Sequence, residues 1–314
     1  MNRDQIVLSH QTALLYHRAR RLASARGQEL EAHDSPAIAA LLGLPHLDVL
    51  VAPGQPRPRS SIMRVHIRSG LDPLPYCEVI APKIMVCSPE LALWQLGCSS
   101  ADESAALLAY EACGTFAPDA TMPDGCLYDL PPICSTEKIR RVANDLNDFT
   151  GERRGASLSR MLTSVVDLAA SPAEARLCLA MVAPRLMGGY GLPKPQLNVN
   201  INVSGAARSL TNKRMVKPDG IWYPRRVVYE YQGVIHATKE RLESDAGRDN
   251  ALLAMGYRVI HITRKQVGNY DLYRGLMETL RLTLGVRKDL PSPRILERQY
   301  QLWKRLFKSG GIRD

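Results

Sequence analysis

Alternating apolar and polar positions are clearest in the C-terminal half of the chain. Over residues 197–203 the sequence LNVNINV places an asparagine at every second position, as in a half-exposed strand. The apolar segments 219–223 and 227–234 flank Pro224-Arg225-Arg226, and their lengths and turn residues indicate an antiparallel hairpin. This part of the chain therefore contains at least three neighbouring strands.

Capping signals mark the predicted helices around these strands. Ser171-Pro172-x-Glu174 combines an N-cap serine, a first-turn proline and a glutamate at the third helical position. A polar helix over 238–255 ends at Gly256, and the strand 257–263 follows it. An amphipathic helix over 268–285 completes the order α-β-β-β-α-β-α.

The N-terminal half has a mixed pattern. Ser35-Pro36 begins a short helix, and the segments 47–52 and 64–68 have the composition of strands. Two capped helices follow, and the Pro-, Asp- and Gly-rich stretch 117–134 predicts a long surface loop. These features predict an N-terminal α/β module over residues 1–135.

A length of 314 residues favours two domains, each with its own core. We expect an α/β protein with a helical linker at 136–170, a second domain at 171–285 and a basic amphipathic helix at 286–314.

The two halves of the chain differ in net charge. Residues 1–170 have a net charge of −3 and residues 171–314 one of +13. Nucleic acid is the polyanion that most often explains such an asymmetry, although a basic surface without a partner is the alternative.

Composition excludes several classes of protein. No apolar run reaches the length of a membrane helix, and the first residues lack the apolar core of a secretion signal. We therefore expect a cytoplasmic protein with no membrane partner. The seven cysteines contain no C-x-x-C pair, so we expect reduced and mostly buried thiols.

The predicted hairpin brings acidic residues together. If it closes around Pro224-Arg225, then Asp219 faces Glu230 and Lys217 faces Gln232. Two carboxylates at that spacing repel each other unless a cation lies between them, and Mg²⁺ prefers oxygen ligands. A slip of one residue in register would send one carboxylate to the opposite face.

These residues resemble the motifs of the PD-(D/E)xK nuclease superfamily, in particular the domains similar to very-short-patch-repair endonucleases. The resemblance covers about residues 171–265. It includes Pro218-Asp219, Trp222-Tyr223-Pro224, Val228-x-Glu230-x-Gln232-Gly233-x-x-His236, Asp245-x-x-Arg248-Asp249 and Gly256-Tyr257-Arg258-Val259-Ile260. It implies a restriction-endonuclease-like α-β-β-β-α-β core, with a mixed sheet flanked by helices.

The resemblance also implies a catalytic site. Asp219 and Glu230 would bind Mg²⁺ or Mn²⁺, the carbonyl of Tyr231 would complete the metal site, and Glu174 would be an outer carboxylate. His236 would orient a water. Metal-assisted hydrolysis of a phosphodiester would follow from this set.

The sequence departs from the family at the third motif position, where Gln232 replaces the usual Lys, Asp or Glu. A neutral amide can orient a water or join the metal shell, but it can neither accept a proton nor offer a charge. Lys217, across the hairpin, could supply a positive charge, although a lysine at a strand end usually meets solvent or phosphate.

Several candidates have a structural alternative. Glu174 stands where a helix cap favours glutamate, and His236 could be a satisfied turn residue. Asp245, Arg248 and Asp249 share one helical face, where they could form a solvated ion-pair cluster. The functional alternative places Arg248 on a phosphate, and His261 is expected in the core.

Further basic residues are candidates for contact with nucleic acid: Arg225, Arg226, Lys239, Lys304, Arg305 and Lys308. The last three lie on the C-terminal helix, interleaved with Tyr300, Trp303 and Phe307. This helix could lie on DNA, or its aromatic side could pack on the nuclease core with the basic side chains solvated.

The N-terminal region resembles the C-terminal part of AbiEi-type antitoxins through Ser9-His10-Gln11-Thr12-Ala13-Leu14, the strands described above and Val86-Cys87-Ser88-Pro89-Glu90. This resemblance implies a regulatory module that binds a partner protein or a second copy of the chain.

The predicted function is a Mg²⁺-dependent DNA endonuclease in repair, restriction or phage defence. The main alternative is a non-catalytic, antitoxin-like DNA-binding regulator with a decayed nuclease site. An RNA-directed nuclease is a third possibility, because the metal site does not distinguish the two sugars.

Overall fold

Two compact units make up the chain in the computed structural model. The structure describes residues 6–30, 34–51, 57–58, 60–67, 74–99, 103–150, 152–233, 239–287 and 291–308. Unit 1 comprises Met1–Asp119 and Cys126–Val165, and unit 2 comprises Ala120–Gly125 and Val166–Asp314. Both units combine helices with β-sheet, so the protein is of mixed α/β class.

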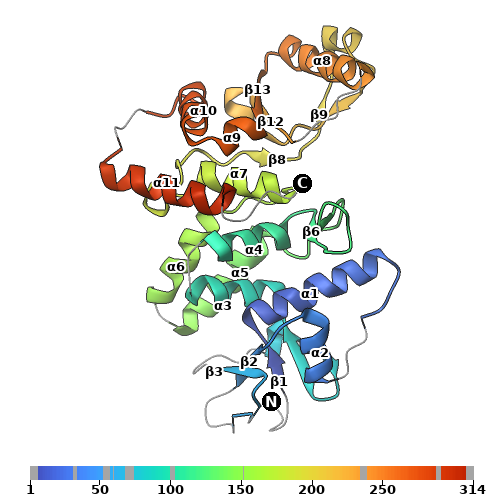
Figure 1. Ribbon diagram of the computed structural model, residues 1–314, viewed down its shortest axis with the longest axis vertical. Helices are drawn as coiled ribbons and strands as arrows, with labels where there is room; N and C mark the ends of the chain where they lie inside the picture. The colour runs from blue at the N-terminus through green and yellow to red at the C-terminus, as the bar shows by residue number, and fades with distance from the viewer. Residues whose placement is uncertain are drawn as a thin grey trace. The chain divides into compact units, whose positions relative to one another are not determined.

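Unit 1 contains a five-stranded sheet in the order β3-β2-β1-β5-β4, of which Figure 1 labels β1, β2 and β3. Its strands are β1 (Ile6–Leu8), β2 (Leu47–Val51), β3 (Met63–Ile67), β4 (Cys77–Ala81) and β5 (Ile84–Cys87). The pairs β1–β5 and β2–β3 are parallel, and β1–β2 and β4–β5 are antiparallel. The short strands β6 (Ala117–Pro118) and β7 (Cys126–Leu127) pair within the segment expected as a long loop.

Helices account for the rest of unit 1: α1 (His10–Ala25), α2 (Ser35–Leu42), α3 (Pro89–Ser99), α4 (Glu103–Cys113), α5 (Thr136–Thr150), α6 (Glu152–Thr163) and the 3₁₀ turn η1 (Leu74–Tyr76). The expected linker at 136–170 is helical, but α5 and α6 both pack on α3 within unit 1. The reason lies in α5, whose buried side chains Ile139, Val142 and Leu146 form an apolar stripe that needs a partner.

All seven cysteines are free thiols, as expected, and five of them are buried. None of the helices in the described part of the chain combines the length and the apolar character needed to cross a bilayer.

Unit 2 contains a four-stranded mixed sheet in the order β13-β12-β11-β8. Its strands are β8 (Gln196–Leu197), β11 (Gly220–Trp222), β12 (Val227–Gln232) and β13 (Arg258–Thr263). A separate pair joins β9 (Ile201–Asn202) to β10 (Met215–Val216). The central strand β12 runs antiparallel to β11 and parallel to β13.

The helices of unit 2 are α7 (Pro172–Val182), α8 (Lys239–Ala254), α9 (Arg264–Gly268), α10 (Tyr270–Thr283) and α11 (Pro293–Phe307). Shorter 3₁₀ turns are η2 (Arg185–Met187), η3 (Gly205–Ser209) and η4 (Tyr223–Arg225). Figure 1 shows the four-stranded sheet between α7 and α8. Ile221 and Val228 on the sheet pack with Ala251 and Leu252 of α8 in one buried cluster.

The hairpin has the predicted register. Gly220 pairs with Tyr229, Ile221 with Val228 and Trp222 with Val227, so the strands close around Pro224-Arg225. Arg226 completes the turn in the left-handed region, with φ 49°. Gly220 is required here because a Cβ on it would lie 2.2 Å from the Tyr229 ring.

The segment 197–203 differs from the single strand that its alternation predicts. Leu197 and Ile201 belong to different sheets, and Asn198 between them has φ 51°. Asparagine tolerates this left-handed conformation better than most residues. Leu197, Ile201 and Val203 are buried, as the alternation predicts, but the strand is interrupted after Leu197.

Candidate active site

Asp219 and Glu230 lie on opposite strands of the β11–β12 hairpin. Asp219 directly precedes β11, and the register of the next pair, Gly220 with Tyr229, places it opposite Glu230. Its Oδ2 accepts the backbone N–H of Tyr231 at 2.5 Å. Glu230 is only 6% exposed, which is uncommon for a carboxylate unless it is paired.

Arg248 of α8 pairs with Glu230 through an ion pair between Nη2 and Oε2. The second carboxylate oxygen, Oε1, is buried and has no hydrogen-bond partner among the described residues. Asp249, the next residue, contacts His261 of β13 instead. The expected solvated ion-pair cluster on this helical face is therefore wrong for Arg248 and Asp249, because both side chains reach the sheet.

The carboxyl of Asp219 has an unusual protonation equilibrium. Burial, aided by the nearby charge of Glu174, raises its pKa to about 7, although the Tyr231 N–H, Arg248 and Lys217 oppose the rise. A carboxyl with this pKa is only partly ionised at neutral pH. A cation bound here would favour the ionised form and release a proton.

Glu174 fulfils its structural role at the N-terminus of α7. Its Oε2 accepts the Ala170 N–H at 2.9 Å, and the Ser171 hydroxyl lies 3.0 Å from its Oε1. The predicted cap is confirmed, since Ser171 Oγ also accepts the Glu174 N–H. Burial raises the pKa of this carboxyl as well, and the negative charge of Glu174 contributes to the raised pKa of Asp219.

Asn198 is hydrogen-bonded to both Glu174 and Asp219, and it was not among the site residues predicted from the sequence. Its Nδ2 donates to Glu174 Oε2 at 2.7 Å and to the Leu168 carbonyl at 3.0 Å. Its backbone N–H donates to the Asp219 carbonyl at 3.1 Å. The one signal in the sequence was an asparagine, a residue that tolerates positive φ, in the middle of an apparent strand.

The predicted pairing of Lys217 with Gln232 lies outside the β11–β12 ladder. The β11–β12 ladder is limited to the three pairs from Gly220 to Trp222, and the side chain of Lys217 is exposed between β10 and β11. It is close enough to Glu174 and Asp219 to lower the pKa values of both carboxyls. Lys217 therefore contributes positive charge beside Glu174 and Asp219.

Gln232 instead contacts β13. Its Nε2 lies 3.0 Å from His261 Nδ1, and His261 Nε2 lies 2.7 Å from Asp249 Oδ2. His261 was expected in the core, but its side chain is 33% exposed and joins Gln232 to α8. Asp249 and His261 could not be linked from sequence, because they lie on different elements.

The donor set fits a hard divalent cation. It consists of the Asp219 carboxylate, the buried free Oε1 of Glu230 and the carbonyl of Tyr231, and such oxygen ligands suit Mg²⁺ and Mn²⁺. No group of three or more His, Cys, Asp or Glu side chains that could hold a metal occurs among the described residues. A cation here would therefore depend on backbone and water oxygens, as Mg²⁺ commonly does.

The two turn arginines have structural contacts. Arg226 Nη1 donates to the Met255 carbonyl at 3.1 Å and so caps the C-terminus of α8. The Arg225 guanidinium lies against Gly285, and Arg225 is exposed. His236 lies outside the described residues, as does the side chain of Lys239.

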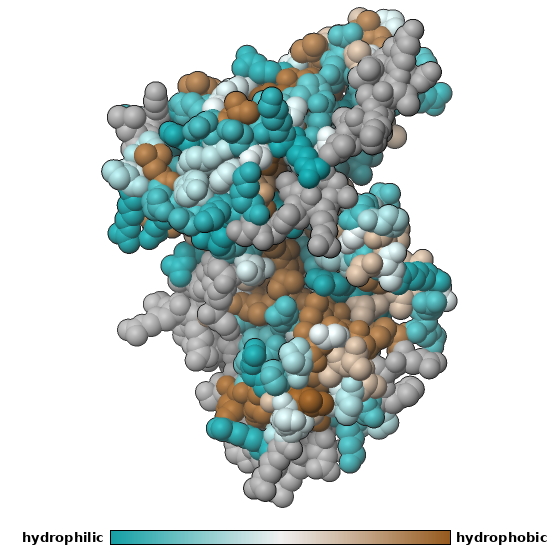
Figure 2. Space-filling model, viewed as in Figure 1, coloured by the Kyte–Doolittle hydropathy of each residue, from teal (hydrophilic) through white to brown (hydrophobic). Residues whose placement is uncertain are grey.

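The aromatic side of α11 packs on unit 2, which was one of the two expected arrangements. Trp303 Nε1 donates to the Val267 carbonyl at 2.8 Å, and Phe307 is buried. Lys304, Arg305 and Lys308 point to the exposed side of the helix. Hydrophilic side chains cover most of the face of unit 2 in Figure 2.

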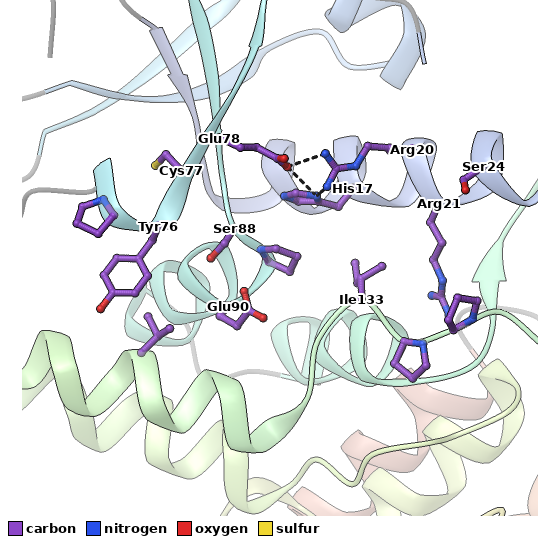
Figure 3. A pocket seen from close by; sticks show the side chains of 15 residues that line it. His17, Arg20, Arg21, Ser24, Tyr76, Cys77, Glu78, Ser88, Glu90 and Ile133 are labelled. Carbon is purple, nitrogen blue, oxygen red and sulfur yellow. Dashed lines mark hydrogen bonds and ion pairs between the residues drawn. The ribbon is translucent and has the colours of Figure 1, made fainter. Parts of the chain in front are cut away.

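A cavity of about 730 Å³ lies in unit 1, apart from these residues (Figure 3). His17 and Arg20 of α1 and Glu78 of β4 form one of its walls. Arg20 bonds Glu78 at 2.6 Å, and His17 Nε2 lies 2.8 Å from the Cys87 carbonyl. Burial lowers the pKa of His17.

No family model matches this chain, and comparison with curated proteins and with solved structures gave no match.

Proposed function

We propose that unit 2 is a metal-dependent nuclease that hydrolyses phosphodiester bonds in DNA with Mg²⁺ or Mn²⁺. The observation that carries this proposal is the pair Asp219 and Glu230, opposed across one hairpin, with a buried oxygen of Glu230 left without a hydrogen-bond partner among the described residues. Burial of carboxylates is costly without a counter-charge, and a cation supplies one. The basic C-terminal half offers a surface suited to a polyanion.

The order of elements supports the same proposal. If the separate pair β9–β10 is left aside, helix α7, the sheet strands β8, β11 and β12, helix α8 and the parallel strand β13 follow one another in the order of a restriction-endonuclease-like core. The acidic residues lie at the hairpin and at the start of α7, where the PD-(D/E)xK resemblance requires them.

Each residue has a task in this proposal. Asp219, Glu230 and the Tyr231 carbonyl hold the cation, and Glu174 adds negative charge beside Asp219. The bound cation would lower the pKa of a water ligand and offset the charge that develops on the phosphate. Arg248 balances Glu230 before the cation binds and would contact a phosphate afterwards. The exposed basic side chains Arg225, Lys304, Arg305 and Lys308 contact the DNA backbone.

Purified protein incubated with supercoiled plasmid, linear duplex, mismatched duplex or single-stranded RNA tests the proposal. With Mg²⁺ or Mn²⁺ we expect cleavage of at least one DNA substrate, and none with EDTA. Asp219→Ala should be slower by about 100-fold or more, since it removes a metal ligand. A wild type that cuts no DNA, or an Asp219→Ala variant that cuts equally well, would contradict the proposal.

A non-catalytic DNA-binding regulator is the second candidate, and two observations favour it. Gln232 replaces the ionisable third residue of the motif, and Arg248 already gives Glu230 a counter-charge without a metal. A regulator predicts duplex binding that needs no divalent cation and no rise in melting temperature with Mn²⁺. A nuclease predicts that Mn²⁺ stabilises the wild type but not Asp219→Ala.

A further inference from the structure

The amide of Gln232 is held in one orientation. Gln232 follows Glu230 by two residues on β12, so both side chains lie on the same face of the sheet. His261 is the register partner of Glu230 on β13, and its ring lies on that face too. The amide nitrogen of Gln232, not its oxygen, lies against His261 Nδ1 at 3.0 Å.

Asp249 determines which ring nitrogen of His261 carries the proton. A carboxylate only accepts hydrogen bonds, so His261 Nε2, at 2.7 Å from Asp249 Oδ2, must be the N–H. In the neutral ring Nδ1 is then an acceptor, and the Gln232 amide can only donate to it. The amide oxygen of Gln232 consequently points away from His261.

We infer that Asp249 and His261 are positioning residues that fix Gln232 with its amide oxygen directed toward the cation site at Asp219 and Glu230. This inference rests on the proposed metal site and deepens it. Gln232 then acts as a neutral oxygen ligand for a hard divalent cation such as Mg²⁺ or Mn²⁺. Its N–H group, which would repel a cation, is turned toward the ring.

The chain thereby compensates for the residue that the motif lacks. A free glutamine presents either its oxygen or its nitrogen, since the two amide orientations differ only by a half-turn. The ring of His261 removes one of them. Asp249 Oδ1 is buried without a hydrogen-bond partner among the described residues, and the other oxygen of this carboxylate holds the ring.

The tautomer of His261 tests the inference without any metal or DNA. We expect ¹⁵N NMR of the metal-free full chain to show the proton of the His261 ring on Nε2 rather than on Nδ1, with the signal assigned from His261→Gln. Asp249→Leu should lower the population of this tautomer. A ring proton found on Nδ1 instead of Nε2 would overturn the inference.

Mn²⁺ affinity, measured by calorimetry, tests the consequence. His261→Ala and Gln232→Leu should each weaken Mn²⁺ binding by about 10-fold or more, as is usual for residues that orient metal ligands. Gln232→Glu should bind Mn²⁺ at least as tightly as the wild type. When His261→Ala is added to Gln232→Glu, the affinity for Mn²⁺ should change little, because a carboxylate presents an oxygen in either orientation.

An equal loss of affinity from His261→Ala in the wild type and in the Gln232→Glu variant would show a merely structural role and overturn the inference. The exposed His46→Ala is the matched control and should leave the affinity unchanged. Wild type that binds no Mn²⁺ overturns both this inference and the metal site. The expected tautomer and affinities in a protein that cuts no DNA would support the inference and contradict only the nuclease.

Discussion

Single ionisable side chains in this protein differ in how their buried charge is balanced. Glu230 forms an ion pair with the guanidinium of Arg248, whereas no ion pair of this kind is seen for Asp219 or Glu174 among the described residues. Their raised pKa values express this difference. The metal-free site therefore carries less than its formal negative charge at neutral pH, and cation binding should release protons.

His17 gives a test of burial that is independent of the proposed metal site. Burial lowers its pKa and the charge of Arg20 adds to this, whereas the Cys87 carbonyl, Glu78 and Glu90 oppose it, and the pKa in the unfolded chain is about 6.5. As the pH falls below about 6.5, the unfolded state binds a proton that the folded state binds less readily. Stability is therefore lost on acidification.

The prediction is that His17→Gln, which can still donate to the Cys87 carbonyl, reduces this loss. Urea unfolding of both proteins at pH 7.5 and pH 5 measures it, with exposed His46→Gln as the control. If the unfolding free energy falls by the same amount from pH 7.5 to pH 5 in the wild type and in His17→Gln, the explanation is contradicted.

Gly220 tests the close contact within the hairpin. A Cβ at this position would meet the ring of Tyr229, which is fully buried. Gly220→Ala should lower the free energy of unfolding by about 1–3 kcal/mol, the usual cost of overpacking. Gly268→Ala, where a Cβ meets nothing within 4 Å, should not lower stability. Equal effects of the two substitutions in urea unfolding would contradict this account.

At the scale of elements, the start of α7, the β11–β12 hairpin and β13 are brought together by polar side chains as much as by the core. Asn198 joins the break after β8 to Glu174 at the start of α7. His261 joins β13 to both β12 and α8. These contacts connect Glu174 of α7 and Asp249 of α8 to the strands of the sheet that carries Glu230.

Asn198→Val should therefore be strongly destabilising. The substitution places a β-branched residue at φ 51° and removes two hydrogen bonds, which together should cost about 2–4 kcal/mol. Asn200→Val, at an exposed position of the same segment, should change the free energy of unfolding by less than about 0.5 kcal/mol. A similar change in the free energy of unfolding for the two variants would contradict a structural role for Asn198.

Local signals predicted the elements well, and tertiary contacts account for what they missed. The turn Pro224-Arg225 gave the register of the hairpin, Ser171 the start of α7 and Gly256 the end of α8. Nothing local indicates that Asn198 interrupts a strand. Likewise, spacing along one helix cannot tell whether Arg248 meets solvent or a strand that precedes it in the sequence.

At the scale of the whole molecule, the unequal division of charge is the feature most directly tied to the proposed partner. The half of the chain with a net charge of +13 contains the acidic site, and the exposed face of α11 adds Lys304, Arg305 and Lys308. Phosphate contacts by such residues release counterions and make binding dependent on salt.

Replacement of these three residues by glutamine should weaken duplex binding and lower the salt slope of log K by about 2.7, or about 0.9 for each lost phosphate contact. Fluorescence anisotropy at several salt concentrations measures this slope. Lys138, Arg140 and Arg141 on α5 form a matched exposed set in unit 1 and should change nothing when replaced. A slope that responds equally to both triple variants would place the DNA elsewhere.

Metal-dependent nicking of supercoiled plasmid is the most direct measurement of the central claim. The account predicts that the wild type relaxes or linearises the plasmid with Mg²⁺ or Mn²⁺. It also predicts that Asp219→Asn slows this reaction by about 100-fold or more, while exposed Asp271→Asn in the same unit leaves the rate unchanged. Equal rates for wild type and Asp219→Asn, or no cleavage by the wild type with either metal, would contradict it.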